Sequence, residues 1–95
     1  MGTENLKILK KSLKTYGVEK TILVCMEELS ELIQAISKVE RYPDEEIRKY
    51  NLVEEIADVN IIVEYLKIIY DINNEDISEW ADRKLSRLSK ILGDE

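Results

Sequence analysis

The sequence predicts an all-α protein, a four-helix bundle-type fold that is completed by self-association. Apolar residues recur three and four positions apart through four long stretches, which is the periodicity of amphipathic helices. The chain contains only three Gly and one Pro, so few positions interrupt these stretches. We expect residues 1–95 to form a single helical domain, without internal repeats or linkers.

The first two helices are separated by a glycine. Leu6, Leu9, Leu13 and Tyr16 share one helix face, which predicts a helix from about Thr3 to Tyr16. Gly17 is suited to a helix C-terminus. A second helix is expected from about Val18 to Glu40.

Capping residues indicate where the last two helices begin. Arg41–Tyr50 contains the only proline and a charged cluster, so we expect a loop with at most one helical turn. Asn51, with Glu54 three residues later, resembles a capping box for a third helix that ends near Tyr70. Asn73 is the expected N-cap of a fourth helix, and Gly93 its end.

The expected third helix is apolar around nearly its whole circumference. Val53, Ala57 and Ile61 lie on the face away from Leu52 and Ile56. One small bundle cannot cover such a helix, so a second subunit is expected to cover part of it. The predicted assembly is a homodimer or a homotetramer.

Composition excludes several classes of function. A net charge of −6 argues against a nucleic-acid partner, and no apolar run is long enough to span a membrane. The single cysteine, Cys25, excludes an internal disulfide framework and favours a cytoplasmic location. It lies on the apolar arc of the second helix, so we expect a buried free thiol. The absence of histidine removes Ser-His and Cys-His nucleophile pairs. The remaining chemistry belongs to carboxylates, lysine, arginine, tyrosine or a metal ion.

Four acidic residues stand where apolar side chains are expected. On the second helix Glu28 falls inside the apolar arc, and Glu31 lies at its margin. Glu55 and Asp58 interrupt the apolar arc of the third helix. Each pair is spaced i, i+3, so its members share a helix face. If the two helices pack antiparallel, all four carboxylates can meet.

Such a cluster is costly unless a cation compensates it, because like charges repel and partial burial removes water. All-oxygen ligands suit Mg²⁺, with Mn²⁺ as the alternative. We therefore interpret Glu28, Glu31, Glu55 and Asp58 as metal ligands. About four acid-x-x-acid pairs are expected by chance among 20 acidic residues, so the spacing alone is weak evidence. For Glu31 a solvated acidic edge is an equal alternative.

Three basic residues are candidates for contacting an anion beside the metal. Lys84 falls inside the apolar arc of the fourth helix, which we expect to close over the acids, and Arg87 lies at the edge of that arc. Lys38 lies two turns beyond Glu31 on the same face. All three could bind phosphate. The alternatives are a lysine extending from the core edge to solvent and an internal ion pair for Lys38.

The acidic residues also carry a family resemblance. Glu28-Leu-Ser-Glu31, 23 intervening residues and Glu55-Ile-Ala-Asp58 resemble the E-x-x-E…E-x-x-D motif of MazG-like nucleotide pyrophosphohydrolases. These belong to the all-α NTP pyrophosphatase superfamily. The phrases EELSELIQAISK and NLVEEIADVNIIVEYL, and the closing KLSRL, are also similar to family sequences. The resemblance covers about Val18 to Leu92.

The resemblance implies a function. Glu28, Glu31, Glu55 and Asp58 would bind Mg²⁺ and hold a nucleoside triphosphate during attack of water on the α-phosphorus. The products would be a monophosphate and pyrophosphate, in nucleotide-pool house-cleaning, with Lys38, Lys84 and Arg87 on the phosphates. Two alternatives stay open. One is a non-catalytic helical oligomer or partner-binding module with a relic site, and the other is a phosphoribosyl-ATP pyrophosphatase.

Overall fold

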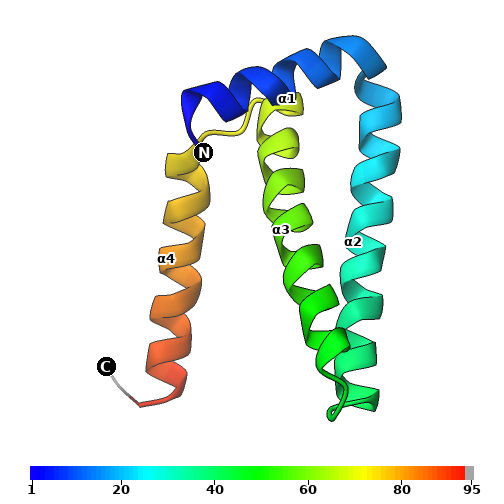
Figure 1. The fold of residues 1–95 in the computed structure, drawn as a ribbon. Helices are drawn as coiled ribbons and strands as arrows, with labels where there is room; N and C mark the ends of the chain where they lie inside the picture. Colours follow the sequence, from blue (N-terminus) through cyan, green and yellow to red (C-terminus); the bar gives the residue numbers. More distant parts are fainter. Residues whose placement is uncertain (94–95) are drawn as a thin grey trace.

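The computed structural model describes residues 1–93 as four α-helices joined by short turns (Figure 1). The helices are α1 (Thr3–Tyr16), α2 (Val18–Arg41), α3 (Glu46–Ile69) and α4 (Asn74–Ile91). None of the described residues forms a β-strand. The predicted all-α class is confirmed.

Helix α1 lies across one end of the α2/α3 pair and packs on both helices (Figure 1). Leu9, from its apolar face, is buried. Gly17 has a φ of 88°, and its N–H donates a hydrogen bond of 2.8 Å to the carbonyl of Leu13. Glycine adopts this φ without strain, which allows α2 to begin at the next residue in a new direction. The predicted bounds of the first helix are confirmed.

Helices α2 and α3 run antiparallel and form the most extensive helix–helix contact of the described chain (Figure 1). Cys25 and Ala35 from α2 and Ile62 from α3 are buried, and burial raises the pKa of the Cys25 thiol. This agrees with the prediction of a buried free thiol on the apolar arc.

The connection between α2 and α3 is shorter than predicted. The expected loop Arg41–Tyr50 and the expected N-cap at Asn51 are wrong, because α3 already begins at Glu46. Acidic residues at this point favour a helix start, since they interact with its positive N-terminal end. Side-chain contacts also hold the first turn. Arg48 lies over the Tyr42 ring, 4.8 Å from its centroid, and donates a 2.9 Å hydrogen bond to Glu45.

Helix α4 begins as predicted but does not join the other helices. The side chain of Asn73 accepts a hydrogen bond of 2.8 Å from the backbone N–H of Asp76, so the expected N-cap is confirmed. Gly93, at φ 82°, follows the helix in the expected place. No Cα atom of α4 approaches a Cα atom of α1, α2 or α3 within 8 Å, and α4 stands apart in Figure 1. The expectation that this helix closes over the acids within one chain is wrong.

The single chain is open rather than compact. Its accessible surface is 7762 Å², whereas a folded monomer of 11.1 kDa exposes about 5,700 Å². Its radius of gyration is 16.7 Å, against about 12 Å for a compact domain of this length. The buried apolar residues among those described are Leu9, Cys25, Ala35 and Ile62. Much apolar surface is therefore left uncovered.

Candidate metal centre

The antiparallel packing of α2 and α3 brings acidic residues from both helices together. Glu28, Glu31 and Glu55 each offer a carboxylate oxygen, and these oxygens lie within 4.8 Å of one another. Asp58 is not part of that group, but its charge acts on both Glu28 and Glu55. The structure thus places three of the four predicted acids in one cluster and the fourth beside it. Exposed acidic groups also gather without an ion, so proximity alone does not identify a ligand site.

Two oxygens in the cluster lack the partners that buried polar atoms normally have. The residues Glu28 and Glu55 are half-buried, but one oxygen of each, Oε2, is shielded from water and receives no hydrogen bond. Buried polar side-chain atoms are usually hydrogen-bonded, and a buried carboxylate oxygen without a donor is especially unfavourable. The cluster therefore requires a compensating proton or cation.

The pKa of Glu28 is strongly raised. Burial is the main reason that its pKa rises from 4.5 to about 7. The negative charges of Glu31 and Asp58 raise this pKa further, as do a hydrogen bond with Asp58 and the charge of Glu55. In the absence of a cation, this carboxyl group therefore holds a proton close to neutral pH.

Glu55 responds in the same direction. Burial raises its pKa, and the charges of Glu31 and Asp58 add to the effect. A smaller contribution comes from its neighbour Glu54, which is exposed. Both shifts mean that full ionisation of these carboxyl groups is unfavourable in the folded chain. A divalent cation would compensate the negative charges, and carboxylate oxygens are the donors that Mg²⁺ and Mn²⁺ prefer.

The predicted basic residues lie farther away. Lys38 is an exposed residue of α2, seven residues after Glu31, which corresponds to about 10 Å along the helix axis. Lys84 and Arg87 are exposed on α4, which does not contact α2 or α3. The structure of one chain does not bring these two cations to the acids.

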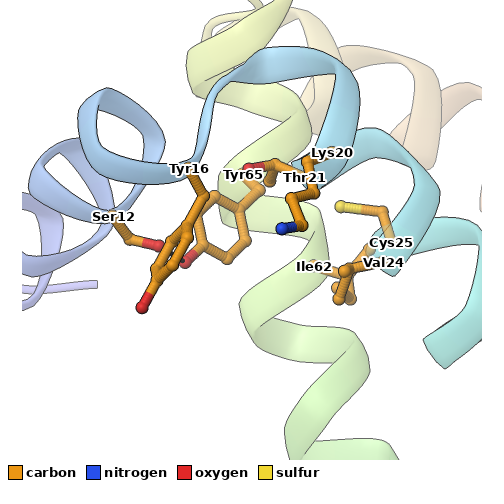
Figure 2. Close-up of a pocket in the computed structure, with 8 residues that line it drawn as sticks. All are labelled: Ser12, Tyr16, Lys20, Thr21, Val24, Cys25, Ile62 and Tyr65. Atoms are coloured by element: carbon orange, nitrogen blue, oxygen red, sulfur yellow. Dashed lines mark hydrogen bonds between the residues drawn. The ribbon is translucent and has the colours of Figure 1, made fainter.

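A second feature, which the sequence did not reveal, lies beside the acids. A cavity of about 360 Å³ is formed by Ser12 and Tyr16 of α1 together with residues of α2 and α3 (Figure 2). Part of its wall comes from α1, which crosses the end of the antiparallel α2/α3 hairpin. Helix periodicity in the sequence cannot predict this crossing. Tyr65 of α3 forms part of its wall.

Within residues 1–93, no helix has both the length and the apolar character needed to cross a membrane.

Comparisons with known protein families, with curated proteins and with solved structures found no match to the chain.

Proposed function

We propose that this chain is a Mg²⁺-dependent nucleoside triphosphate pyrophosphohydrolase, which converts a (d)NTP and water into a (d)NMP and pyrophosphate. One observation carries the proposal: Glu28 and Glu55, on two different helices, each bury a carboxylate oxygen without a hydrogen-bond donor inside a cluster of acids. This is the condition in which a hard divalent cation stabilises a fold. The proposal accounts for polar groups that packing alone leaves unexplained.

The chain's own residues would bind and orient the reactants. Glu28, Glu31 and Glu55 supply oxygens to one small volume, and Asp58 adds a negative charge beside them. When bound there, Mg²⁺ would activate a water molecule and neutralise phosphate charge. Because the acids lie on two packed helices, their positions are set before a substrate arrives, and such preorganisation lowers the cost of reaching the transition state. A chain without histidine can perform this reaction, since carboxylates are sufficient as the protein's ligands to Mg²⁺.

The three basic residues differ in whether they can reach a phosphate at the acids within one chain. Lys38 projects from α2 within about 20° of Glu31, so it can meet a phosphate that extends along this face. Lys84 and Arg87 can reach the acids only from another copy of the chain or after α4 moves. They would therefore contact phosphate in the assembled protein or after a movement of α4, and not in the single chain as it stands.

Self-association is part of the same proposal. Met26, Leu29, Ile33 and Ile36 form a stripe along α2 and are between 38% and 69% exposed. Ile56 and Val63 on the adjoining flank of α3 are 46% and 42% exposed. By helix geometry this apolar face lies on the side of the hairpin opposite to Glu31 and Asp58. A second copy can therefore cover it without covering the acids.

The uncovered area suits an obligate assembly. Each chain exposes about 2,100 Å² more than a folded monomer of its mass, as the values 7762 Å² and about 5,700 Å² show. Burying that excess from each of two chains corresponds to about 4,000 Å² in total, within the range of obligate dimers. A homodimer, or a homotetramer built from it, would complete the MazG-like bundle.

The resemblance of Glu28-Leu-Ser-Glu31 and Glu55-Ile-Ala-Asp58 to the MazG-like motif supports the reaction and a cytoplasmic role in nucleotide-pool house-cleaning. It also leaves the phosphoribosyl-ATP pyrophosphatase reaction as a competing substrate assignment. A non-catalytic helical oligomer with a relic site is the competing class. That reading predicts no turnover that depends on Mg²⁺.

The direct test is product analysis. The purified full chain is incubated with each NTP and dNTP, and with phosphoribosyl-ATP, in millimolar Mg²⁺ or in chelator, and the products are separated by ion-exchange chromatography. The proposal expects monophosphate and pyrophosphate from a (d)NTP only when Mg²⁺ is present. Diphosphate with orthophosphate, or no turnover of any substrate, would contradict it.

A further inference from the structure

The cavity beside the acids lies between the first three helices and has a volume of about 360 Å³ (Figure 2). Pockets for small ligands typically measure about 300–1,000 Å³, so this one suits part of a nucleotide rather than a macromolecule. Its walls are mainly apolar or aromatic, and they include Tyr16, Val24, Cys25, Ile62 and Tyr65.

The cavity neighbours the acid cluster along both α2 and α3. Cys25 precedes Glu28 by three residues on α2, and Ile62 follows Asp58 by four on α3, which corresponds to about 4.5 Å and about 6 Å along the two helix axes. A single sugar ring can bridge such a distance.

The two features also open on the same side of the hairpin. Counting 100° per residue, Val24 projects within about 20° of Glu31 on α2. On α3, Tyr65 projects within about 20° of Asp58. A ligand held by the acids therefore extends into the cavity without crossing either helix.

A few polar groups accompany the apolar walls. Tyr65 donates a hydrogen bond of 3.0 Å to the hydroxyl of Ser12, which leaves the Ser12 proton able to donate in turn. Lys20 points its ammonium group into the space beside Tyr65 and Cys25 (Figure 2), and it has no ion-pair partner in the described part of the chain. Hydrogen-bond donors in an apolar, aromatic pocket match the flat faces and edge acceptors of a nucleobase.

We propose that this cavity binds the base and sugar of the nucleotide whose phosphates lie at the acid cluster. The inference rests on the proposed function and deepens it, because it makes α1 and the start of α2 the determinants of substrate choice. Tyr16 is 64% exposed at the cavity rim and Val24 is 45% exposed. A bound base would cover both side chains.

The test compares two tryptophan variants at neighbouring positions. Val24→Trp fills the cavity, whereas Leu23→Trp adds the same side chain at a residue that is 65% exposed and does not line it. Binding to the full-length chain is measured by calorimetry in Mg²⁺. The probes are the α,β-imido analogues of the four dNTPs, which resist cleavage at the proposed bond, and inorganic tripolyphosphate, which has no base.

We expect the unaltered chain to bind at least one analogue about tenfold or more tightly than tripolyphosphate. Val24→Trp should remove that advantage and leave tripolyphosphate binding within about twofold, while Leu23→Trp retains the advantage. Circular dichroism and the mass in solution check that both variants fold and assemble alike. Analogues that bind no more tightly than tripolyphosphate, or an advantage that survives in Val24→Trp, would overturn the inference.

Failure of the proposed function gives a different result. If tripolyphosphate shows no binding that depends on Mg²⁺, the acid cluster is not the proposed phosphate site. The cavity is then judged with the four deoxynucleosides alone. Binding that Val24→Trp abolishes and Leu23→Trp preserves would support it, and no binding to the unaltered chain would refute it.

Discussion

Glu28 on α2 and Glu55 on α3 each bury one carboxylate oxygen that receives no hydrogen bond, and both residues belong to a group whose oxygens lie within 4.8 Å of one another. The antiparallel packing of these two consecutive helices therefore places both unpartnered oxygens at one cluster of acids.

Divalent cations should stabilise the fold. An ion that binds only the folded state at a hundred times its Kd adds about 2.7 kcal/mol to the free energy of unfolding. Thermal melts at one protein concentration, with millimolar Mg²⁺ or with chelator, should therefore differ by about 10 °C or more. Asp58→Asn should remove most of the shift, and without metal this variant should melt higher than the unaltered chain. An identical melt in Mg²⁺ and chelator would count against a formed site.

Without metal, stability should fall as pH rises. Glu28 has a pKa of about 7 in the folded chain and 4.5 as its ordinary value, so between these values the folded state holds a proton that the unfolded state releases. Its stabilising contribution is full below about pH 4.5 and is lost as pH rises through about 7. Urea unfolding in chelator, at intervals from pH 5 to 8, measures this slope.

Glu28→Gln should flatten that profile, whereas Glu40→Gln, at an exposed position of α2, should leave it unchanged. Saturating Mg²⁺ should also abolish the decline, because the cation replaces the proton. A flat profile in the unaltered chain would show that Glu28 is not perturbed in this way.

The apolar face of the hairpin should hold two copies together. Ile33 is 69% exposed on this face, so Ile33→Lys would place a charge inside the proposed interface. Light scattering should show at least a dimer for the unaltered chain at micromolar concentration and a dissociation constant about tenfold or more higher for Ile33→Lys. Gln34→Lys is the matched control, since Gln34 is exposed outside the stripe. A stable 11.1 kDa monomer would contradict the proposed assembly.

Glu55→Gln should reduce turnover by about two orders of magnitude or more while the helical circular dichroism stays intact. The change keeps the size of the side chain but removes the charge that a metal ligand needs. Initial rates of pyrophosphate release measure the effect. Glu54→Gln changes the preceding exposed acid and should reduce the rate far less. Equal rates for Glu55→Gln and the unaltered chain would exclude Glu55 from the reaction.

Tyr65→Phe should destabilise the junction of α1 and α3 by about 0.5–1.5 kcal/mol, since it removes the hydrogen bond of 3.0 Å to Ser12. Chemical unfolding in chelator measures the loss. In the Ser12→Ala background the same change should cost markedly less, because the bond is already absent. Equal costs in both backgrounds would show that this bond does not contribute.

Local features of the fold were predictable from the sequence. Gly17 ends α1, the Asn73 side chain caps α4, and Cys25 lies on the buried face of α2, all as expected. Each depends on residues within about one helical turn, or on the helical period itself. The start of α3 differs from the prediction because Asn51 and Glu54 mimic a capping box, whereas the acidic residues near Glu46 and the Arg48 contacts allow the helix to begin earlier.

The sequence by itself also determined that Glu28 and Glu55 interrupt apolar arcs, since a helix face follows from residue spacing alone. Only the tertiary structure decided which oxygens meet, because that depends on the register of two helices joined by a turn. It likewise decided that Ser12 meets Tyr65, 53 positions away, to form one side of the cavity, and that α4 stands clear of the acids. Such long-range contacts arise from the packing of whole faces, in which many weak apolar interactions select one arrangement that no short stretch of sequence encodes.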